Sequence, residues 1–405
     1  MKQFYLAKRE LRESARLLVK GKTRPPLSLV VATILVALAI STPLYAQTIT
    51  TFDAPGAGTG TLQGTYALDI EPSGTTIGFV RDANDVRHGF IRSPDGRFTI
   101  FDAPGAGTAA NQGTRAYSTN ASGSITGHFT DSANTAHGYV RSNQGMITVF
   151  DAPGAGTGAN RGTFPFNSPN LISPNGTITG YYVDSAFVNH GFVRDSNGAI
   201  ITFDAPGAGT GASQGTQPFA INEREEITGF YFDGIGAVHG FLRNRRGFIT
   251  TYDVPGGGTG PGQGTYGGGL TPNGTIMGVL VDADNLFHGF LLDTHGRATV
   301  FDAPDAGNVP DSFQGTLPWG INASGEITGW YADDSSVNHG FVRNRRGAIT
   351  EFDVPGAGTG AGQGPNVYSI APNGTAVGFF LDANDAVHGF VRQAHGCALG
   401  QVSEQ

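Results

Sequence analysis

Seven histidines recur at one position of a repeated pattern, and each has an aspartate at a fixed spacing. They begin the phrases His-Gly-Phe or His-Gly-Tyr and are His88, His137, His190, His239, His288, His339 and His388. The aspartate stands six residues before each histidine. Imidazole and carboxylate groups are common metal ligands and common general acids and bases. A metal site and a catalytic site are therefore the first possibilities to weigh.

The spacing of the histidines speaks against both kinds of site. Successive histidines are 49 to 53 residues apart, and no pair has the short spacing of zinc ligands. Equivalent residues of a repeat are related by rotation, so they lie far apart unless they line the central axis. We therefore expect seven structural, half-buried histidines whose ring nitrogens bond to the backbone or to a nearby aspartate. The glycine after each histidine would allow a bulge or a close approach of strands.

The aspartate before each histidine opens a turn, where a short carboxylate can accept hydrogen bonds from turn amides. In three repeats the turn is richer in oxygen ligands, which makes Asp82, Asp282 and Asp382 weak calcium candidates. These turns lack the distal bidentate acid and the glycine of a full calcium loop. The turn role is therefore favoured, and we expect no metal and no cofactor. The aspartate of the recurring Phe-Asp-Ala-Pro phrase is expected to cap amides of the loop that follows it.

The elements that position these residues are strands. A period near fifty indicates a repeat architecture. One repeat contains four short β-branched and aromatic runs separated by turn residues, at 64–70, 75–81, 86–92 and 97–103. Four antiparallel strands per repeat are typical of a propeller blade. The sequence therefore predicts an all-β fold, a seven-bladed β-propeller of four-stranded antiparallel blades.

The two ends of the array predict how its ring closes. The array begins with a single outer strand at 48–54. It ends with a third strand at 387–393, and no Phe-Asp-Ala-Pro phrase follows that strand. Pairing the two would complete the last blade and remove both open edges, which otherwise invite aggregation. We expect the N-terminal strand to close the ring.

The domain organisation follows from the leader and the array. A basic leader, an apolar run of about 14 residues and Ala46 before Gln47 are typical of an export signal over residues 1–46. The run is short for a membrane span, which needs about 20 residues. An uncleaved anchor is the alternative, because Leu44 is not the small residue usual at that site. The propeller then occupies 47–394 and a tail occupies 395–405.

Charge excludes one class of partner. Beyond Ala46 the chain has 17 arginines, no lysine and 31 acidic residues, a formal charge of −14. Such a surface repels nucleic acid. The one cysteine, Cys397, cannot form an internal disulfide and is expected to be a free thiol.

Positions that differ between repeats point to a ligand site, because framework positions must agree to build equivalent blades. Two such positions lie on the first strand of each repeat, which should line the channel. The first holds Tyr66, Arg115, Phe164, Gln217, Tyr266, Leu317 and Asn366. The second holds Leu68, Tyr117, Phe166, Phe219, Gly268, Trp319 and Tyr368. Aromatic residues with one arginine and amides suit a sugar or a peptide. Ten are the expected ligand-binding residues at the channel mouth: Tyr66, Arg115, Tyr117, Phe164, Phe166, Gln217, Phe219, Tyr266, Trp319 and Tyr368. The alternative is that these residues only plug the funnel.

The export signal and the repeat ending in His-Gly-Phe resemble the bacterial extracellular repeat proteins of the HAF family. In that family a His-Ala-Phe phrase lies on a strand, and Gly replaces Ala here in every copy. The resemblance covers nearly all of residues 48–393. It implies an extracellular repeat protein and no catalytic residues.

We expect a secreted, periplasmic or cell-surface protein, a monomer that binds or scaffolds an extracellular polysaccharide or a surface protein. Contact with a membrane would occur only through an uncleaved N-terminal segment. One alternative is a polysaccharide lyase or glycoside hydrolase, which would need an acid–base pair where the symmetry breaks. Its candidates are Arg115, the insertion at 166–172 in the third repeat, and the acidic residues at 223–226. A purely structural surface protein is the other alternative.

Overall fold

A computed structural model describes residues 48–394. The predicted export signal, the tail and Cys397 lie outside the described residues. Residues 48–394 contain 28 strands. Within this range no helix is long and apolar enough to cross a membrane.

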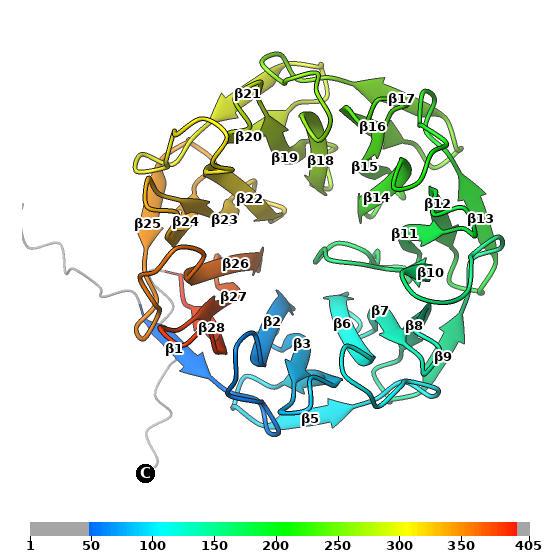
Figure 1. Cartoon of the computed structure of the whole chain (residues 1–405), viewed down its shortest axis with the longest axis vertical. Coiled ribbons are helices and arrows are strands. Elements are labelled where there is room, and N and C mark those ends of the chain that lie inside the picture. The colour runs from blue at the N-terminus through cyan, green and yellow to red at the C-terminus, as the bar shows by residue number, and fades with distance from the viewer. Residues whose placement is uncertain (1–47, 395–405) are drawn as a thin grey trace, which may run out of the picture. The chain divides into compact units, whose positions relative to one another are not determined.

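The strands fall into seven groups of four, here called blades 1 to 7, arranged around a common centre (Figure 1). The inner strands are β2 (Gly64–Ile70), β6 (Gly113–Thr119), β10 (Arg161–Phe164), β14 (Gly215–Ile221), β18 (Gly264–Leu270), β22 (Gly315–Ile321) and β26 (Gly364–Ile370). The second strands are β3 (Thr76–Arg81), β7 (Ile125–Thr130), β11 (Ile178–Val183), β15 (Ile227–Phe232), β19 (Ile276–Val281), β23 (Ile327–Ala332) and β27 (Ala376–Leu381). The third strands are β4 (Arg87–Arg92), β8 (Thr135–Arg141), β12 (Asn189–Arg194), β16 (Val238–Arg243), β20 (Phe287–Leu292), β24 (Asn338–Arg343) and β28 (Val387–Arg392). The outer strands are β1 (Ile49–Phe52), β5 (Phe98–Phe101), β9 (Ile147–Phe150), β13 (Ile200–Phe203), β17 (Ile249–Tyr252), β21 (Ala298–Phe301) and β25 (Ile349–Phe352).

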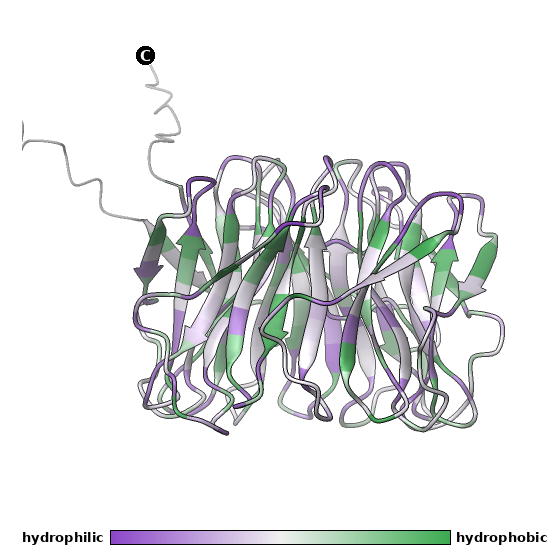
Figure 2. Ribbon diagram, turned by 90° about the horizontal axis from the view of Figure 1, so that it is seen from above, coloured by the Kyte–Doolittle hydropathy of each residue, from purple (hydrophilic) through white to green (hydrophobic). Residues whose placement is uncertain are grey.

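Neighbouring strands within a blade are antiparallel, as in the series β2, β3, β4 and β5. The predicted all-β propeller architecture is therefore confirmed. Figure 2 shows the loops gathered at two opposite faces of the strands. The turns between second and third strands share one face with the crossings from outer strand to next inner strand. We call this the crossing face, and the face with the inner–second turns is the opposite face.

The outer strand of blade 7 comes from the other end of the array. Strand β1 pairs antiparallel with β28, with Ile49 opposite Arg392 and Phe52 opposite Gly389. The ring of Phe52 lies over Gly389, where an added Cβ would approach it to 2.6 Å. The last blade thus contains four strands like the others.

The repeated phrases explain the core of each blade. The aromatic residue of every His-Gly-Phe or His-Gly-Tyr phrase is fully buried, as Phe90 and Tyr139 illustrate. The glycine before it lies under the aromatic ring of the Phe-Asp-Ala-Pro phrase, so that a Cβ on Gly191 would come within 2.7 Å of Phe203. Of the two possibilities expected at this glycine, a bulge or a close approach, the structure shows no bulge. The third strand pairs there in regular register, and the glycine is needed because a ring covers it.

Apolar side chains pack between neighbouring blades, as Ile77 of blade 1 does against Ala116 and Ile125 of blade 2, and a few buried polar groups add hydrogen bonds. The hydroxyl of Thr65 on β2 accepts a hydrogen bond from the amide of Ala54, at 2.8 Å. Asp69, buried at the end of β2, accepts hydrogen bonds from the amide of Thr119 in blade 2 and the hydroxyl of Ser369 in blade 7. Burial raises the pKa of the Asp69 carboxyl to about 7, against the lowering effect of these hydrogen bonds. One carboxylate therefore joins three successive blades.

Candidate functional site

The inner strands contain a β-bulge at the second of the two variable positions. In five blades the pairing with the second strand shifts register around one residue. These residues are Leu68, Tyr117, Phe219, Trp319 and Tyr368. A bulge leaves its residue unpaired in the ladder and redirects its side chain. Two of the redirected side chains meet past blade 5, where the ring centroids of Phe219 in blade 4 and Trp319 in blade 6 are 5.6 Å apart.

A second row of side chains lies beside the first and was not predicted. Each member follows the glycine shared by all second strands, and pairs directly with the first variable position. The row consists of Phe79, His128, Tyr181, Phe230, Val279, Trp330 and Phe379. Tyr66 stacks on Phe79 with centroids 4.6 Å apart. The sequence carried a signal for this row, because it is a variable position inside an otherwise uniform strand.

An apolar cavity of about 290 Å³ lies among blades 3 to 6. Five of the predicted ligand-binding residues line it: Phe166, Gln217, Phe219, Tyr266 and Trp319. Blade 5 makes room for this cavity, because Gly268 stands where other blades have a bulged side chain. The indole nitrogen Nε1 of Trp319 is buried and meets no hydrogen-bond acceptor among residues 48–394. The wall is thus aromatic, with an unused donor and an amide group.

A more polar cavity of about 520 Å³ lies among blades 1 to 3, and we call it the arginine cavity. Five predicted residues line it: Tyr66, Arg115, Tyr117, Phe164 and Phe166. Arg81 and Arg87 also line it, and the lining residues include no aspartate or glutamate. Asn111, Asn134 and Asn160, from crossings and a second–third turn, form its rim, so the cavity lies toward the crossing face. Phe166 belongs to the walls of both cavities.

The arginine cavity is lined by one histidine, His128, and its ring is neutral. Nη1 of Arg115 lies 3.0 Å from Nε2 of His128. Because arginine can only donate, Nε2 accepts and the ring is neutral, with its proton on Nδ1. Burial, followed by the charges of Arg115 and Arg87, lowers the pKa of His128 well below its usual value, and the carbonyl of Pro165 opposes this. His128 therefore acts as a fixed hydrogen-bond acceptor for Arg115.

Tyr368 is the one predicted binding residue that lines neither cavity. Its ring stacks on Trp330 at 5.8 Å and lies 5.1 Å from Trp319. Tyr368 therefore packs against Trp319, a residue of the cavity wall, without lining the cavity itself.

The insertion in the third repeat reaches into the centre of the array (Figure 1). Its inner strand β10 ends at Phe164, and the chain then leaves the usual strand path. The Ser118 hydroxyl of blade 2 donates to the carbonyl of Pro169 and accepts from the amide of Leu171. On the other side, the amide of Ile221 in blade 4 donates to the carbonyl of Asn170. The insertion is thereby fixed to both neighbouring blades, and it places Phe166 between the two cavities.

The seven repeated histidines lie away from these cavities, on the third strands, and are half-buried between two carboxylates. In each, Nδ1 lies 2.7 to 3.0 Å from the aspartate of a Phe-Asp-Ala-Pro phrase. Nε2 lies 3.3 to 3.8 Å from the aspartate six residues earlier. These contacts are of the kind expected for histidines with a structural role. The Phe-Asp-Ala-Pro aspartate binds histidine, so the expectation that it caps loop amides is replaced by this contact.

The weak calcium candidates are occupied by turn hydrogen bonds. Oδ1 of Asp82 accepts from the amides of Asn84 and Val86, at 2.9 and 2.8 Å. Asp282 and Asp382 do the same in their own turns. Between residues 48 and 394 no group of three or more His, Cys, Asp or Glu side chains is arranged to hold a metal ion.

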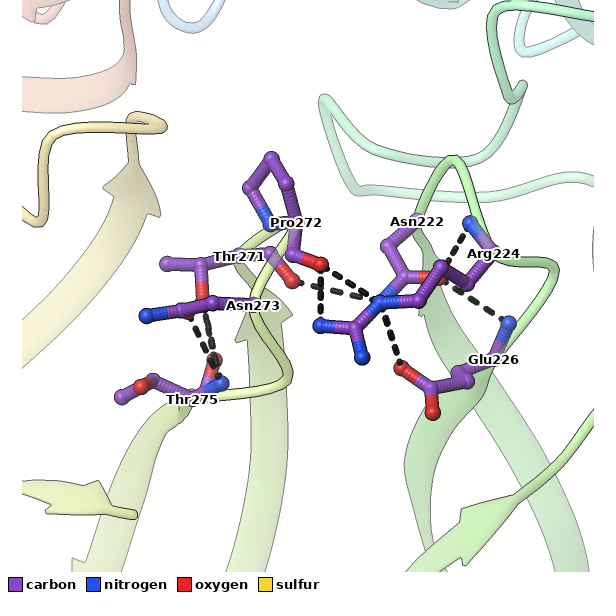
Figure 3. A network of polar contacts seen from close by, with 7 residues as sticks. All are labelled: Asn222, Arg224, Glu226, Thr271, Pro272, Asn273 and Thr275. Carbon is purple, nitrogen blue, oxygen red and sulfur yellow. Dashed lines mark hydrogen bonds and ion pairs between the residues drawn. The ribbon is translucent and has the colours of Figure 1, made fainter. Parts of the chain in front are cut away.

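Glu225 and Glu226, two of the acidic candidates for an enzyme, form turn contacts at the opposite face. Asn222 donates to Glu226 and to the carbonyl of Thr271 in blade 5, and Arg224 donates to the carbonyl of Pro272 (Figure 3). Glu225 pairs with Arg245 at 3.2 Å. These side chains join the turns of neighbouring blades and lie outside both cavity walls.

Comparison with known proteins shows the fold alone. No family model and no curated protein matches the chain. A solved prolyl endopeptidase matches with a TM-score of 0.50 and 10% identity over 80% of this chain, which spans 47% of that protein. TolB from Acinetobacter baumannii matches with a TM-score of 0.41 and 10% identity over 86% of this chain and 80% of that one. The six-bladed β-propeller lectin of Aleuria aurantia matches with a TM-score of 0.37 and 13% identity over 68% and 89%.

Proposed function

We propose that this chain is a binding module whose central channel recognises an extracellular oligosaccharide or polysaccharide. The observation that carries the proposal is the apolar cavity beside Trp319, where an aromatic wall surrounds a buried indole N–H that has no acceptor within residues 48–394. Sugars present apolar ring faces together with hydroxyl groups. An aromatic surface with a few placed polar groups matches that chemistry.

The construction of the channel supports a ligand role over simple plugging. Framework glycines repeat in every blade, whereas the bulged residues differ from blade to blade. Where a plug would need a large side chain, blade 5 has Gly268. Buried donors such as Trp319 Nε1 cost free energy when left unsatisfied, about 1–3 kcal/mol each. A ligand hydroxyl would relieve this cost.

Several further properties belong to the same proposal. We infer that the protein is exported, that it belongs with the HAF-type repeat proteins, and that it is monomeric. We also infer that the pairing of β1 with β28 closes the ring, for which the regular register of the two strands is the support.

Calorimetric titration of residues 47–405 with a panel of polysaccharides tests the proposal. We expect Trp319→Ala to weaken binding at least about tenfold, the loss of one stacking contact and one hydrogen bond. Trp319→Phe keeps a ring but lacks the N–H, so it should fall between wild type and Trp319→Ala. Phe248 is an exposed aromatic residue in the turn that precedes β17. Phe248→Ala is the matched control and should bind like wild type.

Release of reducing ends or unsaturated products would instead identify an enzyme. Binding unchanged by Trp319→Ala would place the ligand elsewhere. Absence of binding to every polysaccharide would reject the carbohydrate proposal and favour a protein partner.

A further inference from the structure

Three arginines line the arginine cavity, and within residues 48–394 only one of them, Arg81, forms an ion pair with a carboxylate. Arg81 pairs with Asp85, with Nε 3.0 Å from Oδ1. The hydrogen bonds that Arg87 and Arg115 make run only to neutral groups. Nη2 of Arg87 donates to Oδ1 of Asn111 at 3.1 Å, and Arg115 donates to His128, to Thr130 and to the carbonyl of Asn111. Two guanidinium groups thus share one cavity without a carboxylate partner on its wall.

One of these groups also has an unused donor. Nη1 of Arg87 is buried and has no hydrogen-bond partner among residues 48–394. Burial, followed by repulsion from the guanidinium groups of Arg115 and Arg81, lowers the pKa of Arg87 to about 10. Buried charges are normally paired. The arrangement is therefore poised for an anion from outside the chain.

All three arginines stand at positions where blades 1 and 2 depart from the repeat. The equivalents of Arg81 are Thr130, Val183, Phe232, Val281, Ala332 and Leu381. The equivalents of Arg87 are Ala136, Asn189, Val238, Phe287, Asn338 and Val387. No equivalent residue is charged, so the propeller framework does not require arginine at either position. This cationic cavity also lies in a chain whose formal charge beyond Ala46 is −14.

We propose that the arginine cavity binds the anionic substituent, a carboxylate or a sulfate, of an acidic oligosaccharide. The proposal rests on the proposed function and names its ligand class. Planar guanidinium groups bind carboxylate and sulfate oxygens through paired, charge-assisted hydrogen bonds. Phe166 lies in the walls of both cavities. One sugar ring can then stack in the apolar cavity while the acidic substituent of the same chain enters the arginine cavity.

Matched pairs of oligosaccharides test this proposal by calorimetry on residues 47–405. One pair is an oligogalacturonate and its carboxyl-reduced counterpart. The other is a sulfated galactan oligomer and its desulfated counterpart. We expect one acidic oligomer to bind at least about tenfold more tightly than its neutral counterpart. A difference in affinity within the first pair identifies a carboxylate as the anionic group, and a difference within the second pair identifies a sulfate. Raising the ionic strength should shrink the difference.

Variants locate the effect. Arg87→Gln and Arg115→Gln should abolish the preference for the acidic oligomer, whereas the exposed Arg246→Gln should leave it unchanged. Equal affinity of wild type for acidic and neutral oligomers, with both weakened by Trp319→Ala, would overturn the anion site and leave the proposed function standing. Failure to bind any oligomer would overturn both. The wild-type comparison decides the matter even where an arginine variant does not fold.

Discussion

Nδ1 of His388 lies 2.9 Å from Oδ1 of Asp53, and so joins the third strand of blade 7 to the residue that follows β1. The same contact within blade 1, between His88 and Asp102, links residues only 14 positions apart, whereas here the separation is 335. The repeat unit is therefore completed by residues from opposite ends of the array. This relationship makes the docking of β1 testable against an internal standard.

Truncating Phe52 should cost as much stability as truncating its equivalent Phe203. Both rings cover a glycine of the third strand and are partly buried, so each change to Ala should lower the free energy of unfolding by about 2–3 kcal/mol. Urea denaturation of the two variants measures this. A nearly silent Phe52→Ala beside a costly Phe203→Ala would show that β1 is not docked in solution. Deleting residues 47–54 should cost still more stability or cause aggregation.

A methyl group on Gly191 should destabilise the fold. The added Cβ would stand 2.7 Å from Cζ of Phe203, so the ring must move. We expect Gly191→Ala to cost about 1–3 kcal/mol, the usual range for overpacking. Gly234→Ala is the control, because nothing lies within 4 Å of its added Cβ. Thermal unfolding that is unchanged in Gly191→Ala would refute the close ring contact, and would bring this repeat nearer to the His-Ala-Phe phrase that it resembles.

Asp69 should make stability depend on pH. Its pKa is raised from 3.8 to about 7 on folding, so the stability linked to its protonated form is complete below 3.8 and is lost as pH rises through 7. The loss amounts to about 4 kcal/mol at most, at about 1.4 kcal/mol for each pKa unit. Asp69→Asn should remove that decline, although it also alters the hydrogen bonds to Thr119 and Ser369. The free energy of unfolding of wild type, minus that of the variant, should therefore fall as the pH rises from 4 to 8. Parallel curves would contradict the assignment.

Two histidines should titrate in opposite directions. A hydrogen bond to Asp302 raises the pKa of His288 to about 9, whereas burial lowers that of His128 well below 6.5. His288 thus contributes stability that is present below pH 6.5 and is lost as pH rises through 9. His128 contributes stability that is present above pH 6.5 and is lost as pH falls. NMR titration of the imidazole protons, assigned with His288→Gln and His128→Gln, measures both values. Titration of both rings near 6.5 would be incompatible with the contacts described.

The sequence predicted most of the fold because each strand is marked by its own phrase. The first inner strand was expected over 64–70 and is Gly64–Ile70. Blade 3 departs from the pattern. Its inner strand ends at Phe164, where the insertion begins. Pro165 is not the reason, because Pro218 and Pro318 lie at the equivalent position within β14 and β22.

The candidate site was only half predicted. The inner-strand positions were found because repeats differ there. The second-strand row and the pair Arg81 and Arg87 also differ between repeats, but only inner strands were assumed to face the channel. The bulges that redirect Tyr117 and Trp319 depend on strand pairing, which residue spacing alone does not reveal.

The chain has two tryptophans, Trp319 and Trp330, and their ring centroids lie 5.0 Å apart beside the apolar cavity. Intrinsic fluorescence therefore reports on the channel without a label. Titrating residues 47–405 with the oligosaccharide that binds most tightly should produce a saturable change in emission. That change should have the same dissociation constant as calorimetry gives, and acrylamide should quench less effectively in the complex. Calorimetric binding with no change in tryptophan emission or quenching would place the ligand outside the channel and contradict the account.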